Sequence, residues 1–139
     1  MNNNIPLGND LIELALPMNP AYVSAARLTV SSIANRMGFN IEDIEDIKAA
    51  VSEACTYLIK QNMHTNPSKI FKIQFKIIQD SLEIILTSHR NPKTENPYAD
   101  DSLGILMIEA LMDKIDVFEE DEMLKISMIK NMSDSFTAL

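Results

Sequence analysis

Apolar and polar residues alternate in two separate parts of the chain, which predicts two pairs of β-strands. Residues 69–78 place an apolar side chain at every second position, with lysine and glutamine between, as in a strand with one face on the core. A turn at residues 79–81 leads into a second strand at 82–88. Residues 114–129 repeat this arrangement, with a turn predicted at Glu120-Asp121. The predicted core face of the second strand consists of Leu82, Ile84 and Leu86.

In two earlier stretches the apolar residues recur with a period of 3.6 residues, which predicts helices over about 20–37 and 41–63. Asn19 can cap the first helix and Pro20 suits its first position, while Asn40 can cap the second. The predicted buried stripe of the first helix consists of Tyr22, Val23, Ala26, Val30, Ile33, Ala34 and Met37. That of the second consists of Ile41, Ile44, Ile47, Val51, Ala54, Cys55 and Leu58.

The remaining segments complete an α+β pattern. Residues 10–17 predict a strand at a sheet edge, because Pro17 cannot donate a ladder hydrogen bond. Residues 89–101 lack periodicity and predict an exposed loop before a third helix. The order β-α-α-β-β-α-β-β predicts one domain over residues 1–139, a two-layer sandwich whose mostly antiparallel sheet is covered on one face by three helices. The predicted stripe of the third helix consists of Leu103, Leu106, Met107, Ala110 and Leu111.

Composition excludes several classes of partner and site. The net charge is −8 and the basic residues are scattered, which argues against nucleic-acid binding. The longest apolar runs are about half of the ~20 residues that cross a bilayer. The N-terminal stretch does not resemble a signal peptide, so we expect a cytoplasmic protein. The single cysteine, Cys55, cannot form an internal disulfide and is expected to be a small buried apolar residue.

A resemblance to a known family rests on two stretches. The first is "ARLTVSSIANRMGFNIEDIEDIKAAVSEACT", residues 26–56, and the second is "LGILMIEALMDKIDV", residues 103–117. They resemble the RsbW-type anti-sigma-factor serine kinases, members of the GHKL superfamily with the Bergerat ATP-binding fold. The resemblance implies a homodimeric protein that sequesters a sigma factor. It also implies phosphorylation of a serine on a small antagonist protein, with ATP and magnesium.

The first nucleotide motif of that family lies on its second helix. A Glu acts as general base, an Asn four residues later holds the metal, and a His often follows after four more residues. This chain keeps Glu53 but has Tyr57 and Gln61 at the other two positions. Magnesium takes hard oxygen ligands in octahedral geometry, for which a phenol replaces a carboxamide badly. Glu53 is therefore either a relic base or a structural carboxylate paired with a nearby cation.

The second motif, Asp-x-Gly-x-Gly, binds adenine in the family. The matching stretch "SHRNP" has Ser88 for the Asp, Arg90 for the first Gly and Pro92 for the second. Serine is an uncharged acceptor, and a Cβ obstructs the close backbone approach that glycine permits. Arg90 is either a plug that bridges to an acidic neighbour across the former pocket or a solvated loop residue.

The third motif, Gly-Gly-x-Gly, offers backbone amides to the phosphates at the start of the third helix. Here Asp101 and Ser102 occupy the first two positions and only Gly104 remains. Either Asp101 or Ser102 can cap the helix, but a carboxylate at this place would repel a triphosphate. The nucleotide lid between the second and third motifs is shortened to residues 93–100.

Three functions follow as hypotheses. The first is an anti-sigma-factor-like regulatory protein that needs no cofactor, with ATP binding lost or weakened. It would bind a sigma factor or antagonist through the Arg27 face of helix one, where Ser24 and Ser31 also lie off the buried stripe. The alternative is an active serine/threonine kinase that uses ATP and magnesium. The third is a fold reused for an unrelated ligand. The alternative role of Arg27 is a structural salt bridge. His64 and His89 are expected to be ordinary surface residues near loops.

Overall fold

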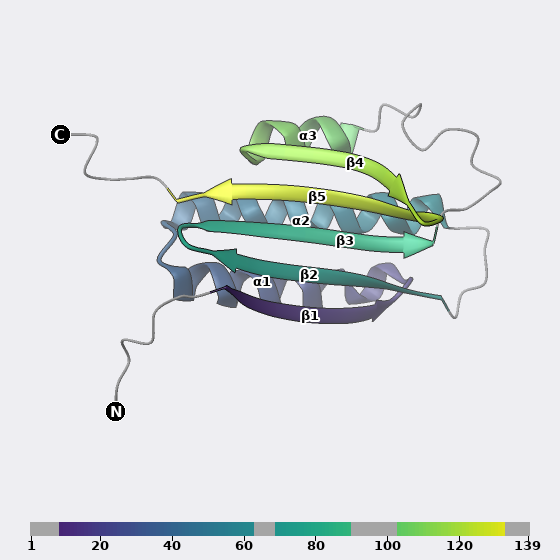
Figure 1. Cartoon of the computed structure of the whole chain (residues 1–139), viewed down its shortest axis with the longest axis horizontal. Helices are drawn as coiled ribbons and strands as arrows, with labels where there is room; N and C mark the ends of the chain where they lie inside the picture. The colour runs from purple at the N-terminus through teal and green to yellow at the C-terminus, as the bar shows by residue number, and fades with distance from the viewer. Residues whose placement is uncertain (1–8, 63–68, 90–102, 133–139) are drawn as a thin grey trace.

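The sheet and its helices lie in residues 9–62, 69–89 and 103–132, which the computed structural model describes. Five antiparallel strands form one sheet in the order β1-β2-β3-β5-β4, so β1 lies at an edge, as Pro17 predicts (Figure 1). The strands are β1 (Asp10–Pro17), β2 (Ile70–Ile78), β3 (Ser81–His89), β4 (Lys114–Glu120) and β5 (Met123–Asn131).

In the described part of the chain, three α-helices cover one face of this sheet and leave the other face without helices (Figure 1). They are α1 (Val23–Met37), which a 3-10 turn η1 (Pro20–Tyr22) precedes, α2 (Ile41–Gln61) and α3 (Leu103–Leu111). Helix α2 packs against both α1 and α3. The predicted two-layer α+β sandwich is thus confirmed. Within the described residues, no helix combines the length and apolar character needed to cross a membrane.

The helix ends follow the predicted capping chemistry. The Asn19 side chain accepts a hydrogen bond from the Ala21 amide at 2.9 Å, and Asn40 accepts one from the Asp43 amide at 2.8 Å. Gly38 ends α1 with a φ of 100°, a left-handed conformation that costs glycine little. The 3-10 turn accounts for the start of the first predicted helix, and the second helix ends within two residues of its prediction.

The hydrophobic core lies between the sheet and the helices. The alternating apolar positions of β2 and β3 face α1 and α2, as the period of two predicted. Its fully buried side chains include Phe71, Ile73, Phe75, Leu82, Ile84 and Leu86 from these strands and Ile47 and Leu58 from α2. This continuous apolar layer fixes how α2 lies on the sheet, and therefore where its polar residues lie.

The predicted stripes of the first two helices are too long at their N-terminal ends. Tyr22 is 45% exposed and Ile41 is 80% exposed, although both were expected in the core. Each residue lies in the first turn of its helical segment. The burial of each stripe begins later, at Val23 and Ile44. The 3.6-residue period identifies a helix face but not how far that face overlaps the opposing sheet.

The predicted stripe of α3 is wrong except at Leu111, which is partly buried against the core. Leu103, Leu106 and Met107 are exposed, and so is Ala110, whereas Ile108 is fully buried. Nearly every residue of "LGILMIEAL" is apolar, so the sequence contains no polar face that would set the rotation of the helix. The structure therefore leaves an apolar face of α3 in solvent.

Both hairpins close through two-residue turns that contain residues with positive φ, one residue in the first turn and both in the second. Gln79 has a φ of 54° between β2 and β3, while Asp121 and Glu122 have φ of 53° and 64° between β4 and β5. The second turn lies one residue later than predicted. Its acidic sequence contains no Asn-Gly or Asp-Gly pair, the usual signal that locates such turns.

Lys130 links the sheet to two helices. Its Nζ donates a hydrogen bond to the Leu111 carbonyl at the end of α3, at 2.7 Å. The same nitrogen lies 3.8 Å from a carboxylate oxygen of Asp43 and 3.8 Å from one of Asp46, both near the start of α2. The Lys130 side chain is only 12% exposed, so these contacts lie in a partly dehydrated environment.

Candidate functional site

The C-terminal half of α2 carries the residues of the first predicted motif. Glu53 is half-buried, and Tyr57 follows one helical turn later with only 5% of its surface exposed. Tyr57 belongs to the hydrophobic core, together with its neighbour Leu58. Gln61, the last residue of α2, is half-buried. The ring of Tyr57 is thus part of the packed interior of the domain.

Ser88 lies near the end of β3 on the helix-covered side of the sheet, in line with the buried Leu86. It is 1% exposed, and its hydroxyl donates to the His89 carbonyl at a long 3.4 Å. Because the residue at this position is a serine and not an aspartate, it offers a neutral oxygen to any ligand on the helix-covered side of the sheet. His89, the next residue, is exposed, as expected.

Gly104 lies in the first turn of α3 and is half-buried. The end of α2, the end of β3 and the start of α3 lie at the same end of the domain (Figure 1). The fold therefore gathers Tyr57, Ser88 and Gly104 at one end, as expected for motifs that meet around one site. Several predicted site residues lie outside the described residues: His64, Arg90, Pro92, the shortened lid at 93–100, Asp101 and Ser102.

The predicted partner surface lies on the outer side of α1. Ser24 and Arg27 are exposed and Ser31 is half-buried, while Leu28 beside them is 72% exposed. No carboxylate of the described residues lies within ion-pair distance of Arg27. The guanidinium still acts at longer range on Glu45 of α2.

The pKa of Glu45 is held below its usual value, mainly by a hydrogen bond and the charge of Lys48 and to a smaller extent by Arg27. The Lys48 Nζ lies 2.9 Å from Glu45, one helical turn away on the same surface. The exposed Glu45 and the half-buried Lys48 therefore place charges of both signs beside the predicted partner surface on α1.

Two small residues of α2, Ser52 and Cys55, have no role in the predicted motifs. Ser52 has a buried hydroxyl oxygen with no hydrogen-bond partner among the described residues. A serine within the apolar pattern "AVSEAC" is the only sequence signal for it. Cys55 is fully buried, as expected, and burial raises the pKa of its thiol to about 12. Such a thiol stays protonated near neutral pH and is not a nucleophile.

A metal site cannot be assembled from acidic, histidine and cysteine side chains alone in the described part of the chain. No three of these side chains lie close enough together to hold an ion. A magnesium ion near Glu53 would therefore need some ligands other than acidic, histidine or cysteine side chains. The chemistry of the site therefore depends on what surrounds Glu53 and Tyr57.

Comparisons with known proteins agree with this architecture. The family model described as a histidine kinase-like ATPase domain matches residues 16–130. The crystal structure of the RsbU and RsbW domains of a Mycobacterium tuberculosis protein superposes with a TM-score of 0.66 at 13% identity. The match covers 88% of this chain and 32% of that longer chain, and it supports the fold.

Sequence relatives give a closer match. Serine-protein kinase RsbW of Bacillus licheniformis is 35% identical, over 87% of this chain and 85% of the relative. The protein of that name from Oceanobacillus iheyensis is 37% identical, over 78% of each chain. The Bacillus subtilis protein is 33% identical, over 84% of this chain and 81% of the relative. The chain therefore belongs to the histidine kinase-like ATPase domain family and, within it, to the family of RsbW serine-protein kinases.

Proposed function

We propose that this chain is an anti-sigma-factor-like regulatory protein that binds a protein partner and has lost or weakened ATP binding. The partner is a sigma factor or its antagonist, met in the cytoplasm by a homodimer of this chain. The observation that carries the proposal is Tyr57. It lies 5% exposed in the core, at the position where the family resemblance places the asparagine that holds magnesium.

The physical argument concerns space and ligand chemistry. A phenol is a poorer hard-oxygen ligand than a carboxamide, and the ring of Tyr57 takes up interior volume. Ser88 adds a second loss, because a neutral hydroxyl replaces the carboxylate that would accept the adenine amino group. Phosphoryl transfer depends on positioning and charge neutralisation, so the remaining Glu53 has little to act on.

A second candidate function is an active serine/threonine protein kinase that uses ATP and magnesium. Glu53 supports it, because the carboxylate is half-buried at the position of the family's general base. The relatives described above also support it, since each is called a serine-protein kinase. In this case Tyr57 would have to leave the core for the nucleotide to enter.

Calorimetric titration with magnesium and ATP separates the two functions. We expect the wild-type protein to give no magnesium-dependent binding, and Tyr57→Asn to gain it because the carboxamide restores a metal ligand. Tyr22→Asn is the matched control, since Tyr22 is an exposed tyrosine outside the site. Melting curves of both variants must show folded protein, because removal of a buried ring costs about 3–5 kcal/mol.

The proposal is wrong if wild-type protein binds ATP tightly with magnesium and phosphorylates a serine of the antagonist. Loss of that transfer in Glu53→Ala would establish the kinase. Binding of ATP to Tyr57→Asn alone supports the regulatory protein. No binding to either protein also supports it, and shows that one restored ligand does not rebuild the site.

The partner surface has its own test. Arg27→Glu should weaken binding of the host's purified sigma factor or antagonist by about tenfold or more, because exposed arginines are frequent hot spots in interfaces. Arg36→Glu makes the same charge change on the same helix, where Arg36 is also exposed. Titration calorimetry measures both. Equal affinities for the two variants would remove the Arg27 face of α1 from the proposed interface.

A further inference from the structure

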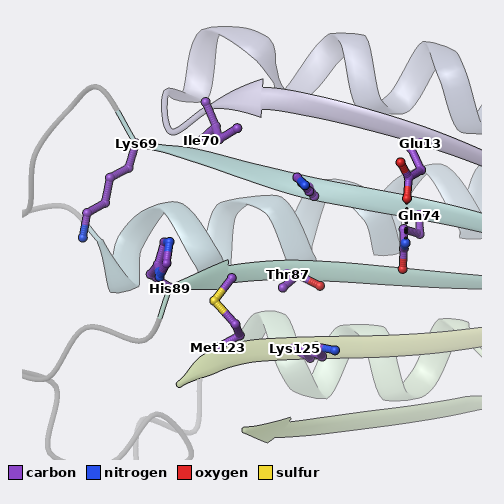
Figure 2. A pocket seen from close by; sticks show the side chains of 9 residues that line it. Glu13, Lys69, Ile70, Gln74, Thr87, His89, Met123 and Lys125 are labelled. Atoms are coloured by element: carbon purple, nitrogen blue, oxygen red, sulfur yellow. Dashed lines mark hydrogen bonds between the residues drawn. The ribbon is translucent and has the colours of Figure 1, made fainter. Parts of the chain in front are cut away.

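A groove of about 610 Å³ lies on the helix-free face of the sheet, opposite the candidate nucleotide site. Figure 2 shows side chains from β1, β2, β3 and β5 along it. We call it the lysine groove, after Lys69, Lys72 and Lys125, which line it together with Thr87 and His89. Its volume is within the roughly 300–1,000 Å³ typical of ligand sites.

Strand register brings these cations together from distant parts of the chain. Lys72 lies opposite Thr87, and Thr87 lies opposite Lys125, so the three form one row across β2, β3 and β5. Neighbouring strands are about 4.8 Å apart, which places the Cα atoms of Lys72 and Lys125 about 10 Å from each other. His89 adds its imidazole in the next row, opposite Met123.

The charges of the groove are only partly compensated. Lys125 donates to Glu120 at 2.8 Å, and Glu13, whose carboxylate accepts a hydrogen bond from the neutral Gln74 amide at 2.8 Å, adds one negative charge to the lining. Lys69 and Lys72 have no ion-pair partner within the described part of the protein. Two ammonium groups thus remain available on a chain whose net charge is −8.

We propose that the lysine groove binds an acidic segment of a protein partner. Charge complementarity supports this occupant, because carboxylates can pair with Lys69 and Lys72 and can compete with Glu120 for Lys125. Apolar side chains of the same segment would contact Ile70 and Met123, which also line the groove.

Other occupants fit this charge pattern less well. Nucleic acid would be repelled by the acidic remainder of the protein. A second copy of the chain that joined through the same face would bring a second set of these lysines into one two-fold interface. The groove also lies across the sheet from Tyr57 and Ser88, so its role can fail or hold independently of the proposed loss of ATP binding.

A fluorescein-labelled hexaglutamate peptide tests the groove by fluorescence anisotropy, with hexaglutamine as the uncharged control. Lys72→Gln should weaken hexaglutamate binding about fivefold, and Lys69→Gln with Lys72→Gln about tenfold or more. Lys76→Gln is the matched control, because Lys76 lies on the same strand and face but does not line the groove. We expect it to change the affinity less than about twofold.

The proposal is overturned if hexaglutamate does not bind, or if Lys72→Gln and Lys76→Gln weaken it equally. Equal binding of hexaglutamine would also exclude charge recognition. Inorganic phosphate that displaces the peptide and binds with the same sensitivity to Lys72→Gln would identify a small-anion site instead. Self-association in sedimentation equilibrium that Lys72→Gln abolishes would assign the face to a contact between copies of this chain.

Discussion

The thiol of Cys55 illustrates how burial controls the chemistry of a single residue. Burial raises its pKa from 9.0 to about 12, because a thiolate would lie among apolar side chains. Above pH 9 the thiol of the unfolded chain loses its proton while the folded thiol keeps it. The free energy of unfolding should therefore fall by about 1.4 kcal/mol per pH unit from this group alone.

Urea unfolding measured below and above pH 9, for wild type and Cys55→Ala, isolates this contribution. The alanine variant lacks the titrating group, and the cost of its cavity does not depend on pH. We expect the stability advantage of the wild type to shrink as the pH rises. Parallel curves for the two proteins across this range would contradict the raised pKa.

The family resemblance predicted that Tyr57 and Ser88 belong to one candidate site, and the fold places both at the same end of the domain. Spacing could not reveal the lysine groove. Lys72 and Lys125 lie on strands far apart in the chain, and only the register of β2, β3 and β5 makes them neighbours. The alternation in β2 identified Lys72 as solvated, but alternation carries no information about which strand lies beside it.

At the scale of elements, predictability depended on the contrast between polar and apolar positions. Polar and apolar residues are clearly separated onto opposite faces in strands β2 and β3 and in helix α2. The boundaries and buried faces of these elements agree with the prediction, apart from the first turn of α2. Helix α3 has almost no polar residues, so its existence was predictable but its rotation was not. Packing against α2 decided that rotation, and it buried Ile108 in place of Leu106.

The whole molecule has two layers that pack through the hydrophobic core and are also linked by Lys130, whose ammonium contacts the end of α3 and the start of α2. Lys130→Met should lower the free energy of unfolding by about 1–3 kcal/mol, because the Leu111 carbonyl loses its donor and Asp43 loses a nearby cation. Chemical denaturation measures this change.

Lys125→Met is the control for that experiment. It removes a lysine from the same strand β5 but on the opposite face of the sheet, where Lys125 pairs with the exposed Glu120. Surface pairs contribute about 0–1 kcal/mol, so this variant should be the more stable of the two. A larger loss in Lys125→Met than in Lys130→Met would show that Lys130 does not join the layers.

The strand order has a consequence for how the chain reaches this structure. The β2–β3 and β4–β5 pairs are closed by short turns. In contrast, helices α1 and α2 separate β1 from β2 in the sequence, although Leu16 of β1 pairs with Phe71 of β2. Contacts between residues distant in sequence carry a larger closure entropy and form late. Strand β1, which is synthesised before the other four strands of the sheet, is thus expected to be among the last to join it. Until it does, β2 keeps an open edge to which another extended chain can add.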